Sequence, residues 1–148
     1  MSIFISIASY QDPLLVSTIF SAYENAENKN DLIFSICDQS DNTIDINGIT
    51  FSDQIHYDHV DPLFSKGPCW ARHRAQSFFN EEDFFLQVDS HTQFAPEWDS
   101  IFIKQLEKIS ANQEIDEYFK KPIITSYPRS FKVLDFEKGL FELNTGDK

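Results

Sequence analysis

Glycine and cysteine are both scarce in this chain, and each scarcity excludes a class of protein. The sequence contains 4 glycines, 6 prolines and 2 cysteines among 148 residues. So few glycines and prolines argue against a low-complexity or disordered chain. Two cysteines are too few for a disulfide framework, and their spacing matches no familiar metal or redox motif. We expect Cys37 and Cys69 to be buried thiols.

Positive charge is the second scarcity. The 12 lysines and arginines are outnumbered by 24 aspartates and glutamates, which gives a net charge of −12. Nothing in the sequence resembles a basic stripe, so we expect neither nucleic acid nor an anionic membrane as a partner. A phosphorylated ligand would need a bound cation or a local cluster of arginines to offset the repulsion.

Long apolar runs are also missing. No stretch reaches the 18 or so apolar residues that a transmembrane helix requires. The N-terminus lacks the basic flank and the small-residue cleavage site of a signal peptide. We therefore expect a soluble, cytoplasmic protein.

The chain is rich instead in phenylalanine, with 15 residues, and its length fits one domain, residues 1–148, with a sizeable core. Apolar runs with β-branched residues predict buried strands, at 3–9, 32–37 and 84–88. Weaker patterns suggest further strands, at 54–60, 122–126 and 131–136. Apolar residues at helical spacing predict helices, at 13–26, from Ser65 through Phe79, and from Pro96 to Ile109. Asp12 is explained as the cap of the first helix.

Strands alternate with helices along the whole chain. This order is typical of an α/β protein with a Rossmann-like, mostly parallel sheet flanked by helices. Such open sheets bind their ligands at the carboxyl ends of the strands. The residues that follow each predicted strand are therefore the first candidates for a functional site.

The strand at 84–88 ends in Asp89-Ser90-His91. In an extended chain Asp89 and His91 point the same way, whereas Ser90 points to the other face. A carboxylate with an imidazole suits a borderline metal such as manganese better than calcium, which prefers oxygen ligands only. The alternative is a strand-end turn in which these side chains only cap the backbone.

A family resemblance rests on residues 65–99, SKGPCWARHRAQSFFNEEDFFLQVDSHTQFAPEWD. This segment resembles the signature of the N-acetylglucosaminyltransferase family whose best-known members glycosylate a hydroxyproline on a cytosolic ubiquitin-ligase adaptor. The opening FISIASYQDP is similar to that family's first strand and turn. A looser likeness is to the polypeptide N-acetylgalactosaminyltransferases, in which a helix carrying an arginine precedes a comparable Asp-Ser-His.

The resemblance implies a GT-A nucleotide-sugar transferase fold with a divalent metal, usually manganese, held by Asp89 and His91. It implies transfer of N-acetylglucosamine from the donor UDP-GlcNAc to a hydroxyl of a protein or glycan acceptor. We assign Arg72 to the diphosphate, because a guanidinium fork matches phosphate oxygens. Arg72 can alternatively pair with the acidic run at 81–83.

By analogy with the fold, the ends of the first two strands flank the nucleoside. Ser9 and Tyr10 end the first strand, and Asp38 follows the second. The tyrosine would stack on uracil, and the carboxylate would accept a ring N–H or a ribose hydroxyl. No residue is assigned as catalytic.

Two other functions stay open. The part of the sequence after His91 is short for an acceptor-binding half, which favours a non-catalytic UDP-sugar-binding module. In the third interpretation, the motif residues serve only the packing of a structural or partner-binding domain.

Overall fold

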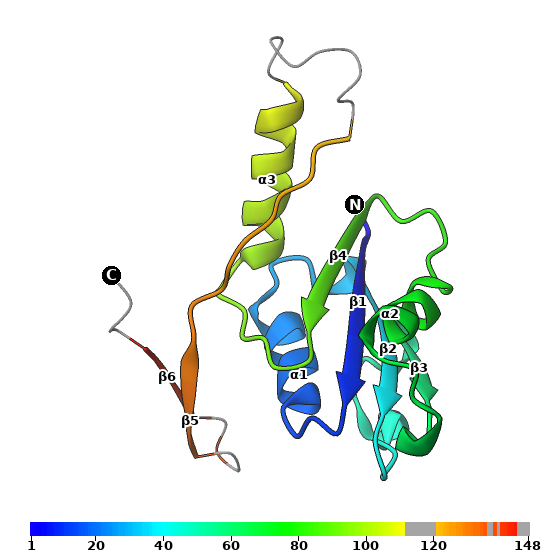
Figure 1. Cartoon of the computed structure of the whole chain (residues 1–148). Coiled ribbons are helices and arrows are strands. Elements are labelled where there is room, and N and C mark those ends of the chain that lie inside the picture. Colours follow the sequence, from blue (N-terminus) through cyan, green and yellow to red (C-terminus); the bar gives the residue numbers. More distant parts are fainter. Residues whose placement is uncertain (112–120, 136–137, 139, 145–148) are drawn as a thin grey trace. The chain divides into compact units, whose positions relative to one another are not determined.

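A computed structural model describes residues 1–111, 121–135, 138 and 140–144 (Figure 1). The chain divides into two compact units, Met1–Ser100 and Ile101–Lys148. The single domain over residues 1–148 stays a prediction.

The first unit is built around one parallel sheet. Its strands and helices are β1 (Ile3–Tyr10), α1 (Leu15–Asn25), β2 (Leu32–Gln39), β3 (Ile55–His59), α2 (Pro68–Gln76) and β4 (Phe84–Asp89). The strand order is β3-β2-β1-β4, and every neighbouring pair is parallel. The α/β class and the parallel sheet with flanking helices are thereby confirmed, and the strand at 54–60 is confirmed as β3. The GT-A assignment stays a prediction.

The sheet is covered on both faces. The connection through α1 leads from β1 to β2, whereas the connection through α2 leads back across the sheet to β4 on the other side of β1. Right-handed crossovers in opposite directions place their helices on opposite faces. Figure 1 shows α2 packed across β1 and β2, which it contacts. The two central strands are accordingly buried on both faces, as their nearly unbroken apolar sequences require.

The register of the strands decides which polar residues share a face. Ala8 of β1 lies level with Cys37 of β2 on one side and with Asp89 of β4 on the other. Side chains that are level in adjacent strands point to the same face. Ala8 and Cys37 pack against Ala71 and Ala75 of α2, so Asp89 belongs to the α2 face.

The loop before β3 contributes the aromatic ring of Phe51 to the core. Phe51 is buried, and its ring stacks on Tyr23 of α1 with the ring centroids 3.7 Å apart. It also packs against Phe34 of β2. Phe51 directly follows residues 40–50, a segment rich in polar residues, so no local sequence pattern predicts its burial.

Helix α2 is shorter than its apolar pattern predicts. It ends at Gln76, so Phe78 and Phe79 do not continue its buried face. The hydroxyl of Ser77 donates to the carbonyl of Arg74 at 2.6 Å, and such local bonds compete with the helical ladder. Phe79 packs edge-on against Phe4, and Phe78 stacks on His56.

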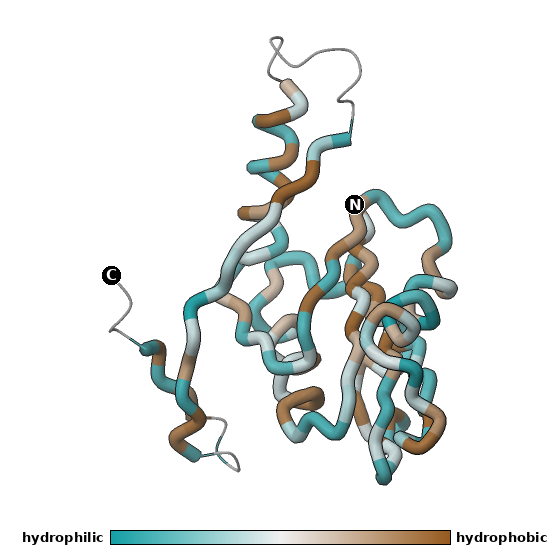
Figure 2. Tube along the Cα trace, viewed as in Figure 1, coloured by the Kyte–Doolittle hydropathy of each residue, from teal (hydrophilic) through white to brown (hydrophobic). Residues whose placement is uncertain are grey.

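Helix α3 (Trp98–Ser110) begins at the end of the first unit. Trp98 is a core residue there, and its indole N–H donates to the carbonyl of Ala22. The carboxylate of Asp99 accepts the backbone N–H groups of Glu27 and Asn28. Figure 2 shows apolar and polar residues alternating along α3. Within the part of the chain that is described, no helix is both long and apolar enough to cross a bilayer.

The second unit contains a separate hairpin. The strand at 131–136 is confirmed as β5 (Phe131–Asp135), and it pairs antiparallel with β6 (Leu140–Leu143). The strand predicted at 122–126 is wrong, because residues 121–130 form no strand. Pro122 and Pro128 offer no backbone donor. Ile123 is 85% exposed, so its apolar side chain finds no core.

The two cysteines differ in environment. Cys37 is buried, and burial, followed by the charge of Asp58, raises the pKa of its thiol to about 11. Cys69 is exposed on the first turn of α2, so its expected burial is wrong. A helix buries only one face, and α2 turns Ala71 and Ala75 inward.

We predict that a thiol reagent at neutral pH labels only Cys69 in the folded chain and labels both cysteines in strong denaturant. The reason is that thiolate, which is the reactive form, is neither formed nor accessible at Cys37. Counting labels by mass spectrometry checks this, and Cys69→Ser should leave the folded chain unlabelled. Equal labelling rates for the two thiols in the folded chain would contradict the structure.

Candidate functional site

Arg72 and Asp89 meet at the carboxyl edge of the sheet. Arg72 projects from α2, and its Nη2 lies 3.4 Å from Oδ1 of Asp89, the last residue of β4. The structure thus pairs Arg72 with the motif aspartate and not with the acidic run at 81–83. Both side chains are substantially exposed, and such a pair contributes little to stability. Each charge is accessible to an incoming group.

The predicted alternation of side chains fails beyond Asp89. The strand ends there, and Ser90 and His91 form a turn. The hydroxyl of Ser90 and Nδ1 of His91 therefore reach the same atom, Oδ2 of Asp12, at 2.7 and 2.8 Å. Ser90 is buried, whereas the His91 ring is 60% exposed.

Asp12 is not the cap of α1, which corrects the sequence interpretation. The N-cap residue is Leu14, and no side chain caps this helix. One carboxylate oxygen of Asp12 accepts the Leu14 N–H at 2.9 Å, and the other binds Ser90 and His91. Burial raises the pKa of Asp12, but the hydrogen bonds from these three donors outweigh it, so the pKa lies below its ordinary value. Asp12 is ionised at neutral pH.

Side chains of α1 also form hydrogen bonds with the backbone of the turn at Ser90 and His91. Thr18 is fully buried, and its hydroxyl donates to the Ser90 carbonyl at 2.6 Å and accepts the Thr92 N–H at 3.0 Å. Further along, the Phe94 N–H donates to the hydroxyl of Ser21. Sequence reasoning missed these supports, because it evaluated α1 only by its apolar positions.

Asp38 lies one strand away, on the opposite face from Asp89. It is level with Ser9 in the register, one step beyond Ala8 and Cys37. Asp38 is only 2% exposed, and its Oδ2 accepts the hydroxyl of Tyr57 at 2.7 Å. Burial, with a smaller contribution from Asp38, raises the pKa of Tyr57 to about 12. Within the described residues, Oδ1 of Asp38 has no hydrogen-bond partner.

The end of β1 presents one buried and one exposed side chain. Ser9 is 1% exposed, and its hydroxyl finds no partner in the part of the chain that is described. Tyr10 is 59% exposed. The Ser9 carbonyl accepts the Gln39 amide, whose oxygen accepts the Ser65 hydroxyl at 2.6 Å. This chain of bonds ties the end of β1 to the loop that enters α2.

That loop turns sharply before the helix. Gly67 has a φ of 88°, in the left-handed region that favours glycine. Its N–H donates to the hydroxyl of Ser65 at 3.3 Å. Pro68 then begins α2 at the first helical position, and Arg72 lies on the second turn. The Gly-Pro pair therefore sets the position from which Arg72 reaches Asp89.

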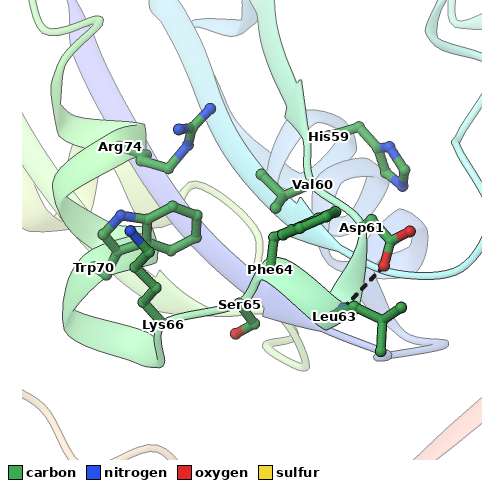
Figure 3. A pocket seen from close by; sticks show the side chains of 9 residues that line it. All are labelled: His59, Val60, Asp61, Leu63, Phe64, Ser65, Lys66, Trp70 and Arg74. Atoms are coloured by element: carbon green, nitrogen blue, oxygen red, sulfur yellow. Dashed lines mark hydrogen bonds between the residues drawn. The ribbon is translucent and has the colours of Figure 1, made fainter.

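A pocket of about 630 Å³ lies beside the end of β3 (Figure 3). Its lining residues are His59, Val60, Asp61, Leu63, Phe64, Ser65, Lys66, Trp70 and Arg74. Arg74 binds Asp58 through two nitrogens at 2.6 and 2.8 Å, so its charge is neutralised. Lys66 lies over the Trp70 ring and has no carboxylate partner among the described residues. None of the six predicted site residues lines this pocket.

The side chains at the carboxyl edge can be compared with the ligands that the expected metal needs. Asp89 and His91 bring a carboxylate and an imidazole, which suit manganese. Across the described ranges, no group of three or more histidine, cysteine, aspartate or glutamate side chains is placed to hold a metal ion. A metal at this edge would therefore need further oxygen ligands from its ligand or from water.

The comparison with protein families bears on this edge. The family model described as Glycosyltransferase (GlcNAc) matches residues 42–146, most of the chain. The chain belongs to this family of GlcNAc glycosyltransferases. The match includes α2, β4 and the turn at His91, so the resemblance seen in residues 65–99 is confirmed at the level of the family. Searches of curated proteins and of solved structures gave no match.

We predict that Thr18→Val loosens the His91 turn and lowers the free energy of unfolding by about 1–3 kcal/mol, because it leaves a buried carbonyl and a backbone N–H unpaired. The change keeps the shape of the side chain, and urea titration measures the effect. Thr50→Val, at an exposed threonine, is the matched control and should change stability by less than about 0.5 kcal/mol. Equal stability of the two variants would contradict the assigned support.

Proposed function

We propose that this chain binds UDP-N-acetylglucosamine at the carboxyl edge of its sheet and transfers the sugar to a hydroxyl of a protein or glycan acceptor. The observation that carries the proposal is the contact of Arg72 with Asp89 beside the His91 turn, in a chain of a GlcNAc glycosyltransferase family. An arginine, a carboxylate and an imidazole gather there, where open α/β sheets bind ligands.

Charge supports a metal in this proposal. The chain carries a net charge of −12, so a diphosphate needs local positive charge. Asp89 and His91 would hold manganese, with diphosphate oxygens and water as the remaining ligands. Bound there, a divalent cation supplies charge that stabilises the departing diphosphate.

The protein's own side chains account for the rest of the donor. Arg72 is assigned to the diphosphate, because its exposed fork can exchange the long contact with Asp89 for phosphate oxygens. Oδ1 of Asp38 is assigned to an N–H of uracil or a hydroxyl of ribose, and the exposed Tyr10 ring to stacking on uracil. Ser9, buried beside Asp38, is assigned to the wall of this subsite.

The GT-A fold in this proposal comes from the resemblance of residues 65–99. The proposal also places the protein in the cytoplasm, and it leaves the acceptor as a hydroxyl of a protein or a glycan. The resemblance also implies that the configuration at the anomeric carbon is retained, which the stereochemistry of a transferred sugar would test.

A second candidate function is a UDP-sugar-binding module without turnover. One observation favours it: among the described residues, no group of three or more histidine, cysteine, aspartate or glutamate side chains is placed to hold a metal ion. Transfer and binding are separable by experiment. Binding of the donor without transfer to acceptors and without hydrolysis would favour the module.

The deciding experiment is calorimetric titration of the purified chain with UDP-N-acetylglucosamine, first with manganese and then with a chelator. We expect binding that requires manganese. A chain that is folded by circular dichroism and binds no donor with manganese present would overturn both candidate functions.

We predict that Asp89→Ala weakens manganese-dependent UDP binding by more than about 10-fold, since even the loss of a residue that only supports a metal ligand costs that much. Stability should change by less than about 0.5 kcal/mol, because the side chain is exposed at a strand end. Calorimetry and urea titration measure the two effects. Asp53→Ala is the control, since this exposed carboxylate precedes β3, at the opposite edge of the sheet. Unchanged binding by Asp89→Ala would refute the assigned role.

We predict that Arg72→Gln weakens UDP binding about 10-fold or more, because one charge-assisted hydrogen bond to the diphosphate is lost. Uridine binding should be nearly unchanged. Lys29→Gln removes the same charge at the opposite edge, before β2, and should affect neither ligand. Competition titrations with the two ligands make the comparison. Equal losses for UDP and uridine would place Arg72 at the nucleoside and not at the phosphates.

A further inference from the structure

The His91 ring enters the candidate site with one of its two nitrogens already bound. Nδ1 lies 2.8 Å from Oδ2 of Asp12. The ring is otherwise exposed, and no hydrogen bond among the described residues uses Nε2. A neutral imidazole donates through one nitrogen and accepts through the other, so the partner of Nδ1 decides what Nε2 can do.

Asp12 is held so that it can act only as an acceptor. Its Oδ1 receives the Leu14 N–H, and its Oδ2 receives the Ser90 hydroxyl at 2.7 Å. Two donors thus bind one carboxylate whose side chain is 15% exposed, and the His91 ring is its third partner. A carboxylate in this setting has no hydrogen to give to Nδ1, so the hydrogen of that bond belongs to the ring.

The scaffold on both sides of the contact is rigid for local reasons. Oδ1 is anchored at the start of α1, and the Ser90 carbonyl is anchored by the buried hydroxyl of Thr18. The position of Asp12 relative to the 90–91 turn is therefore set by three bonds besides its own contact with His91.

We propose that Asp12 is a positioning residue that holds His91 as the tautomer with hydrogen on Nδ1 and presents the Nε2 lone pair at the carboxyl edge of the sheet. A histidine that binds a metal commonly donates its second ring N–H to a carboxylate, which fixes the ring and raises its basicity. Asp12 prepares His91 in this way before any metal is bound. The part of the inference that concerns the metal rests on the proposed function.

The tautomer is measurable in the metal-free chain. Nitrogen-15 spectra of histidine-labelled protein, recorded where the imidazoles are neutral, distinguish a protonated ring nitrogen from an unprotonated one. The His91 signals are identified by their absence in His91→Gln. We expect a protonated Nδ1 and an unprotonated Nε2 in the natural sequence, and loss of this preference in Asp12→Ala. A protonated Nε2 of His91 in the natural sequence overturns the inference whether or not Asp12→Ala folds.

Two controls separate positioning from general support of the turn. Ser90→Ala removes the other side chain on Oδ2 and leaves the His91 contact, so the tautomer should stay. Asp41→Ala removes a neighbouring loop carboxylate that binds Gln11, and it should also leave the tautomer unchanged. A tautomer that changes in Ser90→Ala as much as in Asp12→Ala would make the effect one of loop order and would overturn the specific role of Asp12.

Metal affinity provides the second measurement. Titration of the chain with Mn²⁺ and UDP, followed by electron paramagnetic resonance of free Mn²⁺, should show about 10- to 100-fold weaker metal binding in Asp12→Ala. Equal affinity of Asp12→Ala and the natural sequence overturns the positioning role. Absence of Mn²⁺ binding in the natural sequence refutes the proposed function alone, because the tautomer in the metal-free chain still decides the inference.

Discussion

The carboxylate of Asp12 joins two parts of the chain that are far apart in sequence, and the geometry of the candidate site depends on that link. Ser90 and His91, 78 and 79 residues away, bind the same oxygen. With the bond from Leu14, this carboxylate fixes the end of β4 to the start of α1. A partly buried and ionised acceptor has few alternatives to its own donors, because it is costly to leave a charge unpaired away from water. The conformation of the turn at Ser90 and His91 is therefore set by hydrogen bonds to a carboxylate as well as by packing.

The strand register then distributes the polar residues over two faces that meet at one edge. Asp89 lies level with Ala8 on the α2 face, whereas Asp38 lies level with Ser9 on the other face. A ligand that contacts both Asp89 and Asp38 must therefore extend across the carboxyl edge of the sheet. A nucleoside diphosphate has that character, since its base and its phosphates are separate recognition elements. The pocket beside β3 and Trp70 includes none of Ser9, Asp38, Arg72 and Asp89.

The sequence predicts the framework well, because apolar periodicity is local information. The strands at 3–9, 32–37 and 84–88 and the three helices all form, and Cys37 is buried as expected. What it misses depends on partners distant in sequence: Thr18 and Asp12 act through the turn after β4, and Phe51 enters the core from a polar loop. The strand predicted at 122–126 does not form for a related reason. An apolar run is stabilised as a strand only where a core and a partner strand lie beside it, and local sequence does not reveal either. The Asp89-Ser90-His91 motif is recognisable in the sequence. The predicted alternation of its side chains between two faces is wrong, because β4 ends at Asp89, the first residue of the motif.

The weak pair of Arg72 and Asp89 suits the proposed binding of a metal and a diphosphate together. In the free chain each charge neutralises the other at 3.4 Å, in water, for a gain that is at most about 1 kcal/mol. A cation that takes Asp89 releases Arg72 to a phosphate, and a phosphate that takes Arg72 releases Asp89 to a cation. When both exchanges occur, one exposed ion pair is replaced by stronger contacts, and Arg72 and Asp89 each keep a partner of opposite charge. Metal and diphosphate should therefore favour each other's binding. The ligand that binds first separates Arg72 from Asp89 and so frees the residue that the second ligand needs.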